Sequence, residues 1–462
     1  MARKIKFVLS DLHLGLALPT TKDSKQETVT TEKALVQFLQ RIQSENTAKQ
    51  QEIELILNGD FFDFLQVPAV DTYNPDEAYP MESYADSSQA ASLKRLEIIA
   101  IQQKEVFQAL RDFMHPEFPQ RRVTIIKGDH DVSLFWPGVK NRLRKLLEAS
   151  GERSSLLLFA GEYIKREKIY VEHGHQKAEA VNRYPDFIDP RHPDNPDRLY
   201  YPPSSALFIN LINDVQHDTW VITGIKPVSN LIWYALSWNF NLAVKMLSHF
   251  FSHMSQKDVV ADFLEVLENE ETRRELSRRY ANESKFRQAF HYRVLHYLNL
   301  TKPPTETEAT KNVLNLLPSE ALIIGQTEQE HQQNLLRQAA EDIAKRDKSK
   351  VVLFGHTHHP SQQLLKPGHV YINTGSWTRD FTNLSPDMVE ALFKGKLELH
   401  NTTPRLPYAR IDYDDTGEPI IAQLLYYSVS LDPDDETAPN KVNPKPEENK
   451  RTGGWLSGLF SI

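Results

Sequence analysis

The sequence predicts an α/β fold, because short apolar runs alternate with longer helix-like segments along its 462 residues. Five runs have the length and the β-branched content of buried strands. These runs are residues 5–9, 53–57, 123–126, 169–171 and 351–354. Apolar residues recur at helical spacing between them, for example over residues 32–41 and 93–113. This alternation is typical of a sheet whose strands are joined through helices.

The segments after the fourth run complete the predicted organisation. Residues 178–348 form an insertion that is mainly helical, with a loop at 185–203 and helical stretches at 258–289 and 327–344. Residues 371–377 are predicted to form a strand followed by a turn, and residues 408–411 and 420–427 are predicted to form the closing strands. We therefore expect a core in two parts, residues 1–177 and 349–430, and a tail, residues 431–462. The tail combines a charged, Pro-containing segment predicted to be disordered with an apolar end.

Composition narrows the chemistry that this chain can carry out. It has no cysteine, which excludes thiolate catalysis, Cys-ligated zinc and iron–sulfur clusters. The net charge of −8 argues against a nucleic-acid partner, which usually selects a basic surface. The apolar run at residues 5–9 is too short for the core of a signal peptide, so we expect a cytoplasmic protein.

Each of the five predicted strands ends in aspartate or histidine. The strand ends read Ser10-Asp11-Leu12-His13, Gly59-Asp60-Phe61-Phe62-Asp63, Gly128-Asp129-His130-Asp131, His173-Gly174-His175 and Gly355-His356-Thr357-His358. Ligands of open α/β sheets bind beyond the carboxyl ends of the strands, and glycine there lets the backbone approach a ligand closely. A single Asp–Gly or Gly–His pair would indicate only a turn, but five successive strand ends predict one common site.

Carboxylates and imidazoles together suit Mn²⁺, Fe²⁺ or Zn²⁺ better than Ca²⁺, which prefers oxygen ligands alone. The set is too large for one ion but fits two ions that share a carboxylate. Two such ions activate a water molecule between them and stabilise the attacking and leaving oxygens of an in-line displacement at phosphorus. The pattern therefore predicts hydrolysis of a phosphoester or pyrophosphate bond by a metal-bridging hydroxide.

These residues resemble the motifs of the calcineurin-like metallophosphoesterase superfamily in order, spacing and strand context. Asn373-Thr374-Gly375-Ser376-Trp377 is a familiar continuation in that family. The resemblance covers residues 3–177 and 349–430 and implies a four-layer α/β/β/α sandwich interrupted by the insertion. It also implies an enzyme with two divalent metals, of which Mn is favoured.

The resemblance further implies a role for each residue. Asp11, His13 and His358 would hold the first metal, Asp60 would bridge both, and Asp129, His173 and His356 would hold the second. His130 would protonate the leaving oxygen and Asp131 would orient the His130 ring, whereas Asp63 would bind a ring or loop rather than a metal. His175 lies two residues after His173, would point the same way on an extended segment, and is a candidate for substrate contact.

The chain departs from the family at position 129, where the family has Asn. An aspartate still coordinates metal, but at neutral pH it accepts hydrogen bonds and donates none. It also adds negative charge near an anionic substrate. Tighter binding of the second metal and a slower or pH-shifted reaction are the expected consequences.

The insertion bears on the substrate. Residues 227–244 lack charge, and Asn230, Ser237 and Asn241 form a polar stripe along an otherwise apolar, aromatic segment. An interfacial helix or a lid over a lipid-bearing substrate fits this pattern, and so does packing within the insertion's own core. The apolar end, residues 455–462, would add peripheral membrane contact or be a frayed terminus. The layout resembles UDP-2,3-diacylglucosamine pyrophosphohydrolases, although some of those enzymes have Arg where this chain has His130.

Three functions remain open from sequence. The first is a metallophosphoesterase acting on a bulky or lipid-linked phosphate-containing molecule. The second is a soluble nucleotide or cyclic-nucleotide phosphodiesterase, a protein phosphatase, or an exonuclease of the same superfamily. The third is a non-catalytic scaffold on the same fold.

Overall fold

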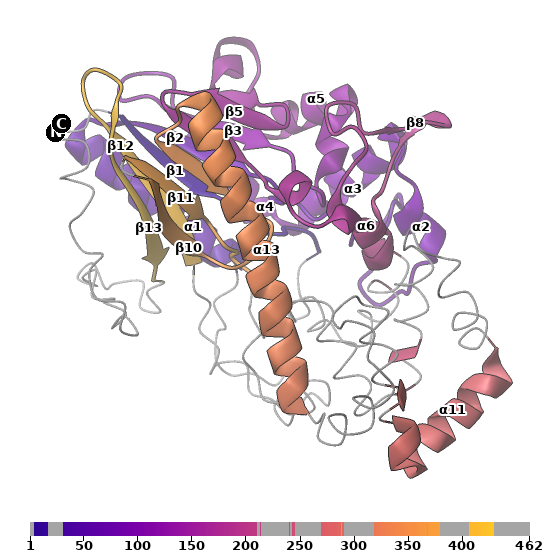
Figure 1. Ribbon diagram of the computed structural model, residues 1–462. Helices are drawn as coiled ribbons and strands as arrows, with labels where there is room; N and C mark the ends of the chain where they lie inside the picture. The colour runs from indigo at the N-terminus through magenta and orange to yellow at the C-terminus, as the bar shows by residue number, and fades with distance from the viewer. Residues whose placement is uncertain are drawn as a thin grey trace. The chain divides into compact units, whose positions relative to one another are not determined.

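The computed structural model describes residues 4–16, 31–209, 213, 240, 243–244, 269–287, 289–290, 318–366, 368–378 and 406–428 (Figure 1). The chain divides into two compact units. The first unit comprises Met1–Pro202, Gln333–Arg379 and Thr402–Ile462, and the second comprises Pro203–Gln332 and Asp380–Asn401. The insertion expected at residues 178–348 therefore differs at both ends from the second unit.

The first unit is mixed α/β, as expected for its class. Its six-stranded sheet has the order β13-β12-β1-β2-β3-β4, with bounds Pro419–Tyr427, Leu406–Tyr413, Lys4–Leu9, Glu52–Asn58, Arg121–Ile126 and Leu157–Phe159. Its five-stranded sheet has the order β10-β11-β9-β6-β5, with bounds Ser361–Lys366, His369–Asn373, Val351–Phe354, Ile169–Glu172 and Tyr163–Arg166. All five apolar runs are confirmed as strands, namely β1, β2, β3, β6 and β9.

Alternation along the strands gives each sheet two buried faces. Phe7 and Leu55 of the six-stranded sheet pack with helices α1, α3, α4 and α5, which span Thr31–Lys49, Gln89–Gln102, Lys104–Phe113 and Pro137–Leu146. Val8 and Ile56 point the other way and pack with Val171 and Leu353 of the five-stranded sheet.

The far face of the five-stranded sheet packs against helix α13, which spans Pro318–Asp347. Val352, Phe354 and Tyr371 contact Leu336 and Ala340 there, and Figure 1 shows the helix lying over these strands. The two sheets thus face each other across one core, and helices cover the opposite face of each.

Two sequence predictions need correction. Residues 93–113 form two helices, α3 and α4, separated at Gln103, whose side-chain amide turns inward and donates to the carbonyl of Gly15 at 3.1 Å. Residues 185–203 are not only loop, because β7 (Arg191–His192) and β8 (Asn195–Leu199) pair as an antiparallel hairpin. These strands, like β4 and β5, are too short or too polar to show an apolar run, and pairing alone makes them strands.

The described part of the second unit includes α6 (Pro203–Leu207) and α11 (Glu270–Asn282). Phe240 is buried there, with its ring centroid 4.6 Å from that of Tyr280 and 5.3 Å from that of Phe290. At Phe240 the apolar stretch of residues 227–244 therefore packs within its own unit. The polar stripe of Asn230, Ser237 and Asn241 and the tail at residues 431–462 lie outside the described residues.

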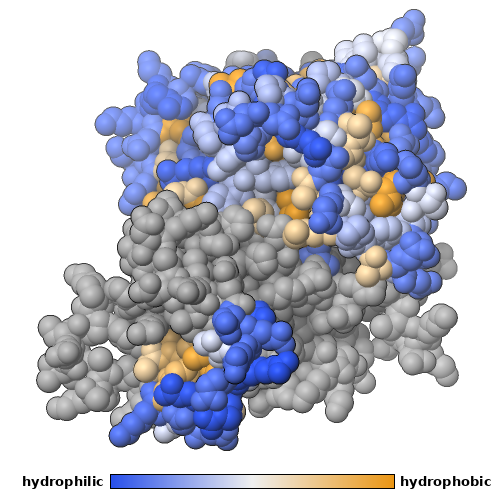
Figure 2. Space-filling model, turned by 90° about the vertical axis from the view of Figure 1, so that its right-hand side faces the viewer, coloured by the Kyte–Doolittle hydropathy of each residue, from blue (hydrophilic) through white to orange (hydrophobic). Residues whose placement is uncertain are grey.

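Seen from the side of α5 and β8, the described surface is mostly hydrophilic, with hydrophobic residues scattered between the polar ones (Figure 2). No helix among the described residues is both long and apolar enough to cross a lipid bilayer.

A buried ionic cluster joins the two sheets at the end where β1 and β2 begin. The ammonium of Lys6 lies 2.6 Å from Glu54 Oε2, and Arg122 and Thr124 contact the same carboxylate at 3.1 and 2.6 Å. Arg166, from the five-stranded sheet, pairs with Glu54 as well. Burial raises the pKa of Glu54, but the positive charges of Lys6 and Arg122 outweigh burial and lower this pKa to about 2.

We expect the Glu54→Gln substitution to destabilise the protein at neutral pH by about 3–5 kcal/mol, because it removes the buried carboxylate that Lys6 and Arg122 share and leaves the buried Lys6 with the partly exposed Glu167. The folded-state pKa of Glu54 lies below its ordinary value of 4.5, so its contribution is complete above that pH. As pH falls towards about 2 the contribution is lost, and the wild-type and variant unfolding midpoints should converge. Urea unfolding followed by circular dichroism from pH 7 to pH 2 measures this.

Glu97→Gln is the matched control, since Glu97 pairs with Arg142 at the surface, where both side chains are about 40% exposed. Its loss should cost at most about 1 kcal/mol. Equal effects of the two substitutions would contradict the role assigned to Glu54.

Candidate metal centre

The side chains that follow the predicted strands meet at one end of the two sheets. Strands β1, β2 and β3 run parallel in one sheet, and β6 and β9 run parallel in the other. The two sheet ends adjoin, since Asp11 Oδ1, after β1, lies 3.3 Å from His358 Nε2, after β9. All seven residues predicted as metal ligands fall in groups that could hold a cation: Asp11, His13, Asp60, Asp129, His173, His356 and His358.

The backbone is strained at most of these positions. Five of the seven have φ in the left-handed region: Asp11 at 53°, His13 at 48°, Asp60 at 49°, His356 at 67° and His358 at 57°. A non-glycine residue in a sparsely populated region costs about 1–3 kcal/mol and persists only where its surroundings hold it. Such strain concentrates at functional sites, and here it aims several side chains at one point.

Two glycines make room for these side chains. A Cβ on Gly128 would lie 2.2 Å from Asp60 Oδ1, and one on Gly59 would lie 2.3 Å from His173 Nδ1. No side chain fits at either position without moving the carboxylate or the imidazole. This close approach explains why glycine precedes Asp60 and Asp129.

Asp11, His13 and His358 form the first group. His13 Nε2 lies 3.1 Å from His358 Nε2, which in turn lies 3.3 Å from Asp11 Oδ1. Asp11 Oδ2 accepts the backbone N–H of His356 at 3.0 Å, while its buried Oδ1 has no hydrogen-bond partner among the described residues. Two imidazole nitrogens and one unsatisfied carboxylate oxygen therefore converge, as they do around a cation.

Asp129, His173 and His356 form the second group. Asp129 Oδ1 lies 3.1 Å from His173 Nε2 and 3.3 Å from His356 Nδ1. The Nδ1–H of His173 donates to the carbonyl of Asn58 at 2.9 Å, which leaves the Nε2 lone pair facing the group. Within the described part of the chain, Asp129 Oδ1 and His173 Nε2 are buried without a hydrogen bond.

Asp60 lies between the two groups. Its Oδ2 is 3.2 Å from His173 Nε2 and 3.8 Å from His13 Nε2. Its Oδ1 is held by the backbone N–H of His130 at 2.9 Å. One oxygen is thus fixed by the backbone and the other faces both groups, which is the position of a bridging ligand.

Asp63 faces imidazole rings, as expected, whereas the contacts of Asp131 differ from those expected. The Oδ2 atom of Asp63 lies 3.0 Å from His13 Nδ1 and 3.1 Å from His130 Nδ1, so one oxygen faces two rings. Asp131 uses its carboxylate on backbone amides instead: Oδ1 accepts from Gly128, and Oδ2 accepts from Phe61 at 3.0 Å. Asp131 was expected to orient the His130 ring, but Asp63 is the carboxylate that faces this ring.

A shell of polar side chains fixes the loops that carry the ligands. The Asn373 amide donates to the carbonyl of Gly355 at 2.9 Å, and the Ser376 hydroxyl donates to the carbonyl of Asp11 at 2.8 Å. The Tyr184 hydroxyl donates to the carbonyl of Asp129 at 3.2 Å. Sequence reasoning assigned no role to these residues, although Asn373 and Ser376 stand in a recognisable motif.

Buried carboxylates dominate the electrostatics of the site. Burial and Asp129 raise the pKa of Asp60, but His173 and His130 outweigh them and set it at about 2. Burial lowers the pKa of His173, yet the Asp60 and Asp11 carboxylates raise it well above its ordinary value. Without a cation, protons on the histidine rings balance the negative charge of the carboxylates. A metal ion must therefore displace these protons to bind the same rings.

The same balance holds at His130 and Asp131. Burial lowers the pKa of His130, but Asp63 and Asp60 raise it to about 9. Burial and the neighbouring Asp60 raise the pKa of Asp131 to about 7. At neutral pH His130 is therefore a charged imidazolium that can give up a proton.

His175 lies beside the second group but not on an extended segment as expected. Gly174 has φ 115°, and His175 starts a short 3₁₀ turn. Its ring nevertheless reaches the site, with Nδ1 3.8 Å from Asp129 Oδ1. Burial lowers the pKa of His175 well below its ordinary value, so the ring is neutral.

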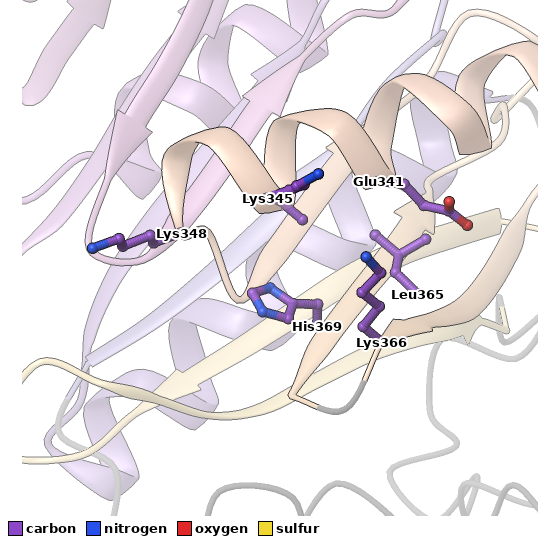
Figure 3. A pocket seen from close by; sticks show the side chains of 7 residues that line it. Glu341, Lys345, Lys348, Leu365, Lys366 and His369 are labelled. Carbon is purple, nitrogen blue, oxygen red and sulfur yellow. The ribbon is translucent and has the colours of Figure 1, made fainter.

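A cavity of about 290 Å³ lies elsewhere, between α13 and the β10–β11 hairpin (Figure 3). Lys348 precedes β9 and His369 begins β11, so this cavity is at the opposite end of the sheet from the candidate centre. Its charged lining consists of three lysines, Glu341 and His369, and the lysines are exposed on long, mobile stems. The convergent aspartates and histidines, rather than this cavity, are therefore the candidate site.

A scan against protein-family models and a search of curated proteins find no match to this chain.

We expect Mn²⁺ or Zn²⁺ to stabilise the folded protein, by about 2.7 kcal/mol when the free metal is at 100 times its Kd. Calorimetric unfolding with and without metal measures this, and elemental analysis gives the stoichiometry. Affinity should fall with decreasing pH, because the raised pKa of His173 sets protons against the metal.

The His358→Asn variant should lose metal from the first group, since Asn replaces an imidazole ligand. His331→Asn is its control, because His331 is exposed on α13 and far from the strand ends in sequence. Equal metal retention by the two variants would show that the first group holds no ion.

Proposed function

We propose that the protein is a dinuclear metal-dependent phosphoesterase of the calcineurin-like metallophosphoesterase superfamily. The observation that carries the proposal is the position of Asp60, whose Oδ2 faces His13 of one ligand group and His173 of the other. A carboxylate between two sets of Asp and His ligands is what two adjacent metal ions require.

The fold supports the same assignment. The core between the two sheets and the helix-covered core on each outer face fit a four-layer α/β/β/α sandwich. In that arrangement five strand ends deliver every ligand to one edge, which suits a site assembled from loops.

The donor set defines the ions. Asp11, His13 and His358 would hold one cation and Asp129, His173 and His356 the other, with Asp60 shared. Oxygen and nitrogen donors without sulfur suit Mn²⁺, Fe²⁺ or Zn²⁺. The resemblance to the family favours Mn²⁺ among them. When bound, the two cations activate the attacking water and neutralise the charge of the phosphate.

His130 is the proton donor in this proposal. Water that has released one proton to the solvent adds its oxygen to phosphorus as the ester P–O bond breaks. The leaving oxygen takes the proton of the His130 imidazolium, and His130 then regains a proton from the solvent. Asp63 faces Nδ1 of that ring at 3.1 Å, which directs Nε2 to the reacting group. Burial lowers the pKa of His130, but the neighbouring Asp63 carboxylate outweighs burial and favours the protonated form of the donor.

Asp129 adjusts this chemistry. Its Oδ1 is shared by His173 and His356, so it can serve as a ligand, but as a carboxylate it donates no hydrogen bond to a phosphate oxygen. We propose a phosphoester or pyrophosphate substrate, bulky or lipid-linked, on which this site carries out the reaction.

We expect purified protein with Mn²⁺ to hydrolyse p-nitrophenyl phosphate or bis-p-nitrophenyl phosphate. Asp60→Asn should abolish the activity and reduce metal content, because it removes the shared charge. His130→Ala should lower kcat by about 10²–10⁴ with metal content unchanged, as loss of a general acid does. His331→Ala serves as the control.

A preference for the diester would indicate a diesterase. No hydrolysis with Mn²⁺, Fe²⁺, Zn²⁺ or Co²⁺ would overturn the enzymatic proposal. A loss of tenfold or less in the His130 variant would favour a scaffold on this fold.

Asp63→Asn tests the orientation of the donor. An amide keeps the shape but removes the charge that raises the pKa of His130. A general acid works only while protonated, so activity falls as pH rises through its pKa, and the variant should lose activity at lower pH than the wild type. The pH–rate profile measures this shift.

Asp131→Asn provides the comparison for Asp63. Because its oxygens accept backbone amides, this variant should change stability rather than the alkaline limb of the profile. If the alkaline limb of the pH–rate profile did not shift in Asp63→Asn, the proposed role of Asp63 at His130 would be contradicted.

A further inference from the structure

His175 is a buried imidazole whose nitrogens the rest of the structure leaves unsatisfied. The side chain is 1% exposed, and neither Nδ1 nor Nε2 has a hydrogen-bond partner within the described residues. An unsatisfied buried polar group is costly, so a native structure that retains one usually provides a partner of another kind.

The orientation of the ring indicates where that partner lies. His175 Nδ1 is 3.8 Å from Asp129 Oδ1, which is too far for a hydrogen bond but allows both atoms to contact one group between them. Asp129 Oδ1 is likewise without a hydrogen bond among the described residues. His175 itself belongs to none of the convergent ligand groups, which places it at their border.

An aromatic wall holds the ring in this orientation. The Phe187 ring centroid lies 4.2 Å from that of His175, with the planes nearly perpendicular, and Tyr184 follows at 5.7 Å. The Lys127 ammonium sits 3.3 Å from the Phe187 ring centroid. Gln176 bonds both backbone groups of Tyr184, at 2.7 and 3.1 Å, so the wall is itself fixed.

We propose that His175 is a substrate-positioning residue that donates a hydrogen bond from its ring to a phosphate oxygen bound beside Asp129. An imidazole carries a ring N–H in either charge state, whereas a carboxylate such as that of Asp129 can only accept. His175 is about as enclosed as the residues it borders, since its exposed fraction of 1% lies between those of His173, 0%, and Asp129, 3%. This inference rests on the proposed function, because it names a contact of the same phosphate.

The test measures binding of inorganic phosphate and of metal, so that neither readout depends on turnover. Mn²⁺-loaded wild type, His175→Ala, His175→Asn and His331→Ala are titrated with phosphate by calorimetry, and metal content is measured on the same samples. We expect an unchanged metal content in every variant. His175→Ala should weaken phosphate binding by about tenfold, as loss of one hydrogen bond to a charged group does, and His175→Asn, which retains an N–H donor, should recover part of it.

Each other outcome has a defined meaning. Equal phosphate affinity in wild type and His175→Ala would overturn the inference and leave the ring a packing role. Loss of one metal in His175→Ala would overturn it in favour of metal ligation. If the alanine variant is unfolded by circular dichroism, the comparison of His175→Asn with His175→Leu decides, because Leu fills the space without a donor.

Failure of the proposed function looks different from failure of this inference. In that case the wild type itself binds no metal, or it binds metal and phosphate but hydrolyses no ester. If the wild type is active, comparing its KM and kcat with those of His175→Ala adds a further distinction. Loss of a residue that positions phosphate should raise KM as well as the inhibition constant of the phosphate product.

Discussion

The site depends on the register in which five parallel strands end. Leu9 pairs with Leu57 and Asn58 with Ile126 in one sheet, and Val171 pairs with Leu353 in the other. Apolar contacts of Val8 and Ile56 with Val171 and Leu353 hold the two sheets together. A slip of one residue in any strand would turn its apolar side chains to the wrong face and carry its aspartate or histidine away from the others. The stability of the core and the geometry of the site therefore depend on the same strand register.

The sequence was most informative where chemistry and periodicity coincide. Strands β1, β2, β3, β6 and β9 were predictable because each is buried on both faces and therefore mostly apolar, apart from residues such as Lys6 and Glu54. The residues after them were predictable as one site because parallel strands deliver their ends to one edge. Short strands such as β5 and the β7–β8 hairpin were not, because their residues are polar and only pairing makes them strands.

Side-chain partnerships were harder to predict than positions. Asp63 and Asp131 both lie close to His130 in space, and spacing along the chain does not distinguish an aspartate that faces a ring from one that accepts backbone amides. The backbone amides of Gly128 and Phe61, which donate to Asp131, decide between them, and their positions are properties of the folded chain. The likewise unpredicted 3₁₀ turn at His175 still brings its ring to Asp129.

The left-handed backbone at Asp11, His13, Asp60, His356 and His358 has a consequence for how this centre tolerates change. Asparagine adopts that conformation more readily than most residues, whereas β-branched side chains resist it. Replacement by Asn therefore alters ligand chemistry while leaving the turns intact, and replacement by Val or Ile would distort the turns as well as remove a ligand. Only a few residue types can therefore replace the ligands at these positions, whether by evolution or by mutagenesis. The backbone conformation imposes this limit independently of any metal.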